Sequence, residues 1–374
     1  MFTREDTKAV KGLAVVLMLL HHLACYSFRF PLDFPGFTSL IPGFVENGYL
    51  TDIALNALIC VLLFFFLGGY GLYKRWENGG FRLLNALLDL YKKYWRVFIV
   101  FVPVAFLFFV RPEGSMSEFC TRYIITSPKQ FLTDLLTNFT GYAATFNSEW
   151  WFFGSYVCML PLGCLFCMGT GKHRSFLADL FLVFAIHILT QGVFPALASV
   201  PALGALGGNL FYYRFLELNK FAPVFFCGVV FAKYDGLVRI KALLGRDVSR
   251  TLLGLAGALA VFICRAWVMT DMDGADVILV PLFAAFVSAL FDGAEALKLG
   301  FSFLGKHSTN MWLVHSFFCY YFLECTKLVY CTGCVWIDLA VLTALSLGAS
   351  VLLELFYGGL SRLVRGHKKV LVTN

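Results

Sequence analysis

The chain has 374 residues, of which 59% are hydrophobic and 14% are charged, and its mean hydropathy is +0.77. Soluble globular chains carry about 25% charged residues, so this composition excludes a soluble enzyme, a disordered protein and an ordinary nucleic-acid-binding protein. The formal net charge of +7 would suggest phosphate binding in a soluble protein. In a membrane protein it reports topology instead, because lysine and arginine are enriched in cytoplasmic segments. The composition predicts an all-α, polytopic membrane protein.

Ten mainly apolar runs approach the length of about 20 residues that a spanning helix needs. They lie at 9–28, 50–73, 94–111, 149–169, 175–197, 210–232, 250–269, 276–292, 301–323 and 336–357. If the N-terminus is cytoplasmic, 22 lysines and arginines fall in inside segments and 5 fall outside. This asymmetry predicts about ten transmembrane helices with both termini cytoplasmic.

The chain is expected to form one transmembrane domain, residues 1–374, because it has no internal repeat and no long hydrophilic segment. The first run has Lys11 near its start and holds two histidines, so it is expected to be a retained helix rather than a signal peptide. The segment 117–139 is amphipathic and is expected to lie on the outer surface.

Three cysteines, Cys325, Cys331 and Cys334, fall in the last outer loop and could form a disulfide there. A zinc site built on Cys331-x-x-Cys334 would lack a second pair of ligands. The sequence therefore predicts no metal site and no bound cofactor.

Histidines deep within the predicted spans are the main functional candidates, because an ionisable side chain in hydrocarbon is costly. His22 lies about 16 Å along a helix from Lys11, near the bilayer midplane, and His315 is similarly placed after Lys306. A buried imidazole can take up or release a proton near neutral pH. Alternatively, each histidine bonds a hydroxyl or carbonyl of a neighbouring helix, which is the favoured interpretation for His21.

Polar residues near the outer ends of the spans are candidates for binding an acceptor. Arg214 and Glu217 share a helix face and either neutralise each other or line a polar cavity. Glu149 and Trp150 could face an acceptor, although the tryptophan position also suits an aromatic belt. Arg265 is expected to snorkel towards the membrane interface.

Basic residues gather where the third run begins. Lys92 and Arg96 are four apart and share a helix face, with Lys93 beside them. Such a group at a cytoplasmic mouth could bind phosphates or anionic lipid head groups. Spacing does not separate these two possibilities.

Four segments in order resemble the acyltransferase 3 family of bacterial membrane acyltransferases. Lys11 and His22 are separated by ten residues, as a basic residue, usually Arg, and a His are in that family. The run 64–70 (FFFLGGY) is similar to a Phe-rich family run, with Gly68 where Ser is usual. Lys92-x-x-x-Arg96 resembles the family's Arg-x-x-x-Arg. The last segment, 304–315, contains LGKHS and ends at His315, and 149–152 (EWWF) also fits.

The resemblance implies transfer of an acyl group, commonly acetyl, from cytoplasmic acyl-CoA to a hydroxyl of an extracytoplasmic acceptor, usually a glycan, at the inner cell membrane. The family's essential His corresponds to His22 and its Arg to Lys11. We expect His22 to act as general base or transient acyl carrier, with His315 as its catalytic partner. Lys11 and the basic group at 92–96 would bind the donor, and Arg214, Glu217, Glu149 and Trp150 the acceptor.

A secondary transporter or a flippase for a lipid-linked substrate is the alternative, because midplane histidines also serve as proton relays. The sequence has no paired half-repeats that would favour it. A third possibility is a membrane module without catalysis of its own that serves a partner enzyme.

Overall fold

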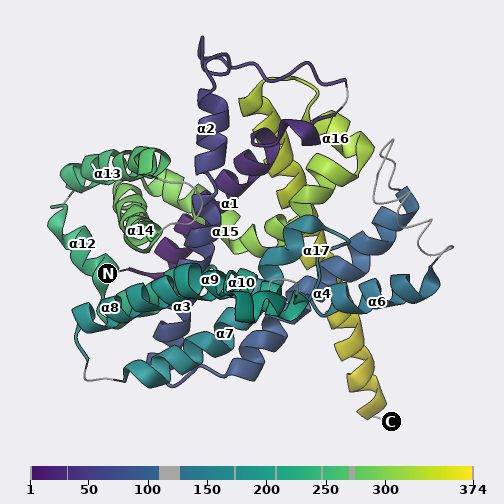
Figure 1. Cartoon of the computed structure of the whole chain (residues 1–374). Helices are drawn as coiled ribbons and strands as arrows, with labels where there is room; N and C mark the ends of the chain where they lie inside the picture. Colours follow the sequence, from purple (N-terminus) through teal and green to yellow (C-terminus); the bar gives the residue numbers. More distant parts are fainter. Residues whose placement is uncertain are drawn as a thin grey trace. The chain divides into compact units, whose positions relative to one another are not determined.

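The computed structural model describes residues 2–31, 33–108, 127–171, 174–206, 209–245, 247–268 and 274–372, most of which are helical (Figure 1). Within these residues there is no β-strand, and one isolated bridge joins Thr38 to Cys334. Helices satisfy every internal backbone N–H and C=O, which the hydrocarbon of a bilayer requires. The predicted all-α class is confirmed.

Seven helical segments of the described chain are long and apolar enough to cross a membrane. They are Arg4–Ala24, Tyr49–Glu77, Ser148–Thr170, Phe176–Leu197, Phe215–Lys233, Val248–Trp267 and Val335–Leu363. The other three predicted runs fall on α4 (Leu83–Phe108), α14 (Asp276–Asp292) and α15 (Glu295–Ser316). The chain is therefore a multi-pass membrane protein, while the number of ten spans and the cytoplasmic termini stay predictions.

The chain divides into two compact units, and the first of the boundaries between them falls within α1 (Arg4–Ala24). The first unit contains 1–21, 52–89 and 151–306, and the second contains 22–51, 90–150 and 307–374. Each unit is therefore built from segments that are far apart in the sequence.

The first unit contains most of the apolar helices. Besides α1 it holds α2 (Tyr49–Asn56), α3 (Ile59–Glu77), α7 (Trp151–Thr170), α8 (Phe176–His187), α9 (Phe194–Leu197), α10 (Leu210–Asn219), α11 (Ala222–Lys233), α12 (Gly236–Leu243), α13 (Asp247–Val268), α14 and the start of α15. A π-helix, Ile188–Val193, joins α8 to α9.

Two helix crossings in this unit depend on reciprocal glycines. A Cβ on Gly69 of α3 would lie 1.9 Å from the Phe225 carbonyl oxygen, and one on Gly228 of α11 would lie 2.0 Å from that of Phe66. The α1–α15 crossing has the same form, because a Cβ on Gly12 or on Gly305 would lie 1.8 Å from a backbone oxygen of the other helix. Small residues allow this close backbone approach in membranes.

Arg265 does not snorkel, because it is buried with a full set of partners. Its guanidinium contacts both carboxylate oxygens of Asp276, at 2.9 and 3.2 Å, and donates to the side chain and carbonyl of Asn56. Both charged side chains are almost fully buried. This pairing ties α13 and α14 to the end of α2.

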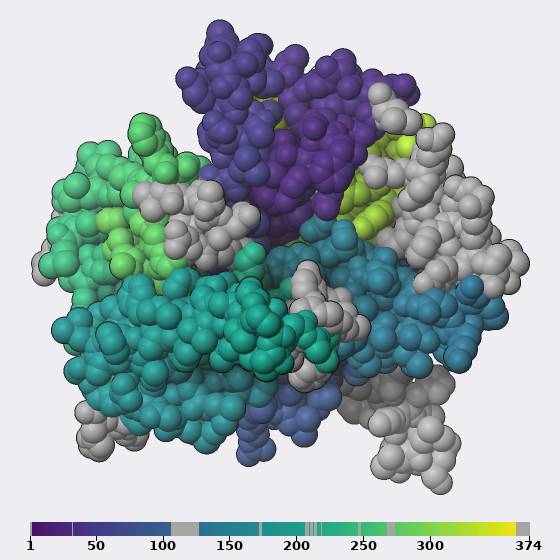
Figure 2. Space-filling model, in the orientation of Figure 1, coloured from purple at the N-terminus to yellow at the C-terminus, as the bar shows by residue number. Residues whose placement is uncertain are grey.

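The outer surface of α13 (green in Figure 2) exposes apolar side chains such as Leu252, Leu259 and Ile263. Exposed apolar side chains on a spanning helix are expected to face lipid. This agrees with the membrane class.

The second unit holds the candidate functional residues. It contains the short helix Ser27–Arg29, most of α4, α6 (Pro128–Phe139), the turn Ser148–Trp150, the end of α15, a π-helix at Phe317–Tyr321, α16 (Leu323–Val329) and α17 (Val335–Val372). Its core surrounds Trp150, whose ring contacts Tyr94, Phe98 and Phe317.

Two expectations from the sequence concern loops of this unit. Of the segment 117–139, residues 117–126 lie outside the described chain, and α6 packs its C-terminal end on α4, where Tyr94 and Trp95 donate to the carbonyls of Asn138 and Phe139. Cys325, Cys331 and Cys334 are free thiols.

Candidate active site

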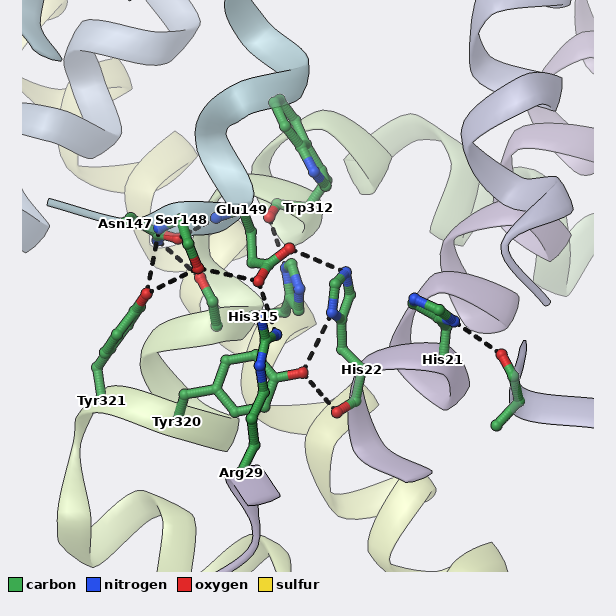
Figure 3. Close-up of polar contacts among 12 residues, drawn as sticks. His21, His22, Arg29, Asn147, Ser148, Glu149, Trp312, His315, Tyr320 and Tyr321 are labelled. Atoms are coloured by element: carbon green, nitrogen blue, oxygen red, sulfur yellow. Dashed lines mark hydrogen bonds and ion pairs between the residues drawn. The ribbon is translucent and has the colours of Figure 1, made fainter. Parts of the chain in front are cut away.

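His21 and His22 are neighbours on α1 but have different surroundings (Figure 3). Adjacent residues of a helix do not share a face. His21 is 3% exposed, and its Nδ1 lies 2.8 Å from the carbonyl oxygen of Ala54. His21 therefore has the helix-bonding role that the sequence favoured for it.

The His22 ring lies between a tyrosine and a glutamate. Its Nδ1 is 3.1 Å from the Tyr320 hydroxyl, and its Nε2 is 3.5 Å from Oε2 of Glu149. The Tyr320 hydroxyl also donates a hydrogen bond of 2.5 Å to the His22 carbonyl. Only 12% of the His22 side chain is exposed. Both nitrogens of a nearly buried imidazole therefore face polar groups.

Tyr320 reaches His22 because the α15 register changes after His315. The α-helix ends at Ser316, and the π-helix that follows closes with a 2.7 Å bond from the Phe322 N–H to the Phe317 carbonyl, five residues back. In a regular α-helix Tyr320 would lie about 140° around the axis from His315. Here both rings lie against His22, with centroids 4.7 Å (His315) and 6.0 Å (Tyr320) from its own.

Glu149 is held in place from several sides. Its Oε1 pairs with Nη1 of Arg29 at 2.8 Å and accepts from the Ser148 hydroxyl at 3.1 Å. Its backbone N–H donates to Oδ1 of Asn147, whose amide in turn donates to the Ser316 hydroxyl at 2.7 Å. The Glu149 side chain is only 7% exposed. The carboxylate therefore has a defined orientation towards His22.

Arg29 balances the charge of Glu149. Its guanidinium lies 4.7 Å from the ring centroids of both Tyr26 and Tyr320, a distance at which a cation is attracted to an aromatic face. Burial lowers the pKa of Arg29, but Tyr320 and Glu149 more than offset this, so its pKa lies above the ordinary value. The site contains a permanent cation, a carboxylate and an imidazole in contact.

His315 is fully buried, and its ring is tilted against that of His22. Its Nδ1 is 2.6 Å from the Trp312 carbonyl, which can only accept, so Nδ1 carries a proton. Its Nε2 has no hydrogen-bond partner among the described residues. This nitrogen can accept a hydrogen bond from a ligand.

The predicted donor-binding residues belong to two different units. Lys92, Lys93 and Arg96 lie on the part of α4 that belongs to the second unit, and all three are exposed. The Arg96 guanidinium lies 5.2 Å from the ring centroid of Tyr357. Lys11 is partly buried in the first unit.

The predicted acceptor-binding residues divide similarly. Glu149 joins the histidine cluster described above. Trp150 is 1% exposed, and its indole N–H donates to the Leu313 carbonyl at 2.9 Å, which is a packing role. Glu217 is half-buried on α10 in the first unit, and the side chain of Arg214 lies outside the described residues. Acceptor contacts by these residues stay predictions.

Sequence reasoning missed Arg29, Tyr320 and Asn147. Arg29 carried a signal, because it is one of only five basic residues in the predicted outer segments. A lone arginine there, close after His22, could have been proposed as the partner of an acid. Tyr320 carried no such signal, because its position depends on the π-helix.

The apolar helices and the buried histidine–carboxylate–arginine cluster define a multi-pass membrane protein with a candidate acid–base site. Comparison with known families matches residues 6–355 to the acyltransferase domain of the acyltransferase 3 family, and the chain belongs to this family. The resemblance inferred from the four segments is thereby confirmed, and the protein is a membrane acyltransferase in general class. Neither the curated proteins nor the solved structures gave a match. The family match crosses both units, and a single domain over 1–374 stays a prediction.

Proposed function

We propose that this protein is an O-acyltransferase of the inner cell membrane that moves an acyl group, acetyl being the simplest, from cytoplasmic acyl-CoA to a hydroxyl of an extracytoplasmic glycan or similar acceptor. The observation that carries the proposal is the buried contact between His22 Nε2 and Glu149, itself paired with Arg29. In a chain of acyltransferase sequence, a buried imidazole beside a carboxylate that can stabilise its protonated form is suited to act as the base for attack by a hydroxyl.

The transfer can be written with His22 as general base. The acceptor oxygen attacks the thioester carbonyl carbon while His22 Nε2 takes the hydroxyl proton. The tetrahedral intermediate then expels the CoA sulfur, which takes the proton back from the imidazolium. The products are the ester and free CoA thiol, and His22 returns to its neutral form.

Glu149 acts in this scheme through His22. A carboxylate 3.5 Å from Nε2 stabilises the imidazolium that forms when the proton is transferred. The acceptor-binding role that the sequence favoured for Glu149 is therefore replaced in our proposal by a supporting role. Arg29 holds the carboxylate in position through their 2.8 Å contact.

His315 would act as the partner of His22 because its ring lies against the His22 ring, with centroids 4.7 Å apart. No direct hydrogen bond between the two rings is needed, because the Nδ1 of His315 is engaged by the Trp312 carbonyl and its Nε2 stays open. In this position the open nitrogen can accept a hydrogen bond from a substrate group beside His22.

The same geometry supports a second route in which Nε2 of His22 attacks the thioester and carries the acyl group. CoA would then leave before the acceptor hydroxyl attacks the acyl-imidazole. Trapping of acyl-His22 after incubation with acyl-CoA alone distinguishes this route from the first.

Donor and acceptor binding complete the proposal. Lys11, Lys92, Lys93 and Arg96 would hold the CoA phosphates as charge partners. The exposure of the three residues on α4 leaves them accessible to such a ligand. On the other side of the membrane, Arg214 and Glu217 would contact the acceptor, while the packing of Trp150 against Leu313 would support the fold around Glu149.

Release of free thiol from acetyl-CoA by the purified protein, with candidate glycans added, tests the proposal. His22→Gln should lower the rate by roughly 10²–10⁴-fold, the range of general acid–base catalysis. His21→Gln is the matched control, since it removes the neighbouring histidine of the same helix, and it should keep the turnover per folded molecule. Full activity of His22→Gln at normal protein levels overturns the catalytic role. Proton-coupled flux without thiol release would instead favour the transporter.

A further inference from the structure

Tyr320 binds both the backbone and the side chain of His22. Its hydroxyl donates a 2.5 Å bond to the His22 carbonyl and lies 3.1 Å from the ring Nδ1 (Figure 3). Tyr320 is 3% exposed and lies in the π-helix Phe317–Tyr321. The double contact therefore forms within a buried, fixed part of the second unit.

These two contacts determine which ring nitrogen carries the proton. A phenol has one hydrogen to donate, and a carbonyl oxygen can only accept. The Tyr320 hydroxyl therefore donates its one hydrogen to the His22 carbonyl, and its oxygen accepts a hydrogen bond from Nδ1. Nδ1 must then be the N–H donor, which leaves Nε2 of the neutral ring with its lone pair.

The carboxylate beside Nε2 stabilises the ring after this nitrogen has taken up a proton. The 3.5 Å separation between Nε2 and Glu149 Oε2 is longer than an ordinary hydrogen bond, so the carboxylate does not hold Nε2 as an N–H donor. His315 has the same assignment of donor and acceptor nitrogens, since its Nδ1 donates to the Trp312 carbonyl and its Nε2 has no hydrogen-bond partner among the described residues. In both adjacent imidazoles Nδ1 is thus the nitrogen that carries the proton.

We propose that Tyr320 is a positioning residue that locks His22 in the Nδ1–H tautomer and so makes Nε2 the atom that takes the acceptor proton or carries the acyl group. The inference rests on the proposed function for its catalytic meaning, and the tautomer itself can be measured without any substrate. A hydrogen bond at one ring nitrogen sets the state of the other.

Nuclear magnetic resonance of isotope-labelled histidine reads the tautomer directly. The chain has 7 histidines, and the difference between wild type and His22→Gln assigns the His22 signals. In an alkaline sample, where the ring is neutral, wild type should show a protonated Nδ1 and an unprotonated Nε2. In Tyr320→Phe the protonated-Nδ1 signature should weaken or exchange with the other tautomer.

Tyr330→Phe, at the residue that follows α16, is a matched control in the same unit. The Tyr330 hydroxyl donates to the carbonyl of Leu23, one residue after His22, at 3.1 Å, and is also buried. Its loss removes the same kind of tyrosine-to-carbonyl bond without touching the imidazole. It should therefore leave the His22 tautomer as in wild type.

Thiol release separates positioning from simple stability. Tyr320→Phe should lower kcat by roughly 10–100-fold, as loss of a partner that orients a histidine does elsewhere, with KM for acyl-CoA nearly unchanged, while Tyr330→Phe keeps kcat per folded molecule. A wild-type His22 protonated on Nε2, or a Tyr320→Phe spectrum identical to wild type, overturns the inference. If the tautomer shifts as expected but His22→Gln keeps full activity, the proposed function fails and the positioning contact stands.

Discussion

Glu149→Gln is the substitution that separates charge balance from catalysis in the candidate site. The change keeps the side-chain shape and an oxygen that can accept from Arg29, but it removes the negative charge 2.8 Å from the guanidinium. Breaking a fully buried ion pair costs about 3–5 kcal/mol. Because 24% of the Arg29 side chain is exposed, we expect a loss of about 2–3 kcal/mol in the free energy of unfolding, seen as a lower midpoint in thermal denaturation.

The effect on turnover has a separate origin. At 3.5 Å from His22 Nε2, a unit negative charge stabilises an imidazolium by about 5 kcal/mol at an effective dielectric constant of 20. Arg29 opposes part of this attraction, so we expect kcat for thiol release to fall on the order of 10²-fold, which corresponds to about 2.7 kcal/mol in the barrier. KM for acyl-CoA should change little.

The double variant Arg29→Met/Glu149→Gln provides the control. With both charges removed, the stability lost in Glu149→Gln should largely return, and kcat should recover only in part, because the imidazolium has lost its carboxylate. Recovery of the full wild-type kcat would refute the reasoning, since Glu149 would then serve only to neutralise Arg29. A Glu149→Gln protein with wild-type kcat would refute it equally.

Two further predictions concern the helix crossings and the donor site. Gly69→Ala should lower the yield and the melting midpoint of the folded protein, because the new Cβ would lie 1.9 Å from the Phe225 carbonyl oxygen. Gly71→Ala is the control, since a Cβ there would meet no atom of a neighbouring element within 4 Å, and it should melt as wild type does in the same thermal scan. Arg96→Gln should raise KM for acyl-CoA by roughly 3–10-fold with little change in kcat, because a charge-assisted hydrogen bond contributes about 1 kcal/mol or more. Arg82 is another exposed arginine, so Arg82→Gln is the control. Equal KM values for the two variants would contradict a donor site at Arg96.

The class of protein and the importance of His22 could be predicted because both depend on local features. An apolar run of sufficient length needs only composition, and the depth of His22 follows from the rise per residue after Lys11. The family motifs added the chemistry. Glu149 was also found, although as an acceptor ligand, because the sequence shows a carboxylate but not what it touches.

The rest of the site could not be predicted because it depends on tertiary pairing and register. Arg29 and Glu149 are 120 residues apart, and nothing local joins them. Tyr320 depends on the π-helix after Ser316, and hydrophobic periodicity does not report a single wide turn. Arg265 was misplaced for a similar reason, since its two buried partners come from α2 and α14.

The family motifs hold two kinds of residue, and the structure separates them. Gly12, Gly69 and Gly305 lie at close helix crossings in the first unit, and Gly68, where the family usually has Ser, leaves room for the Tyr156 hydroxyl 2.7 Å from a Cβ built there. His22 and His315 instead meet in the second unit. Loss of activity after a motif substitution is therefore no evidence of catalysis until it is expressed per folded molecule. The glycine variants should give less folded protein but normal turnover per folded molecule. The histidine variants should give normal amounts of folded protein with reduced turnover.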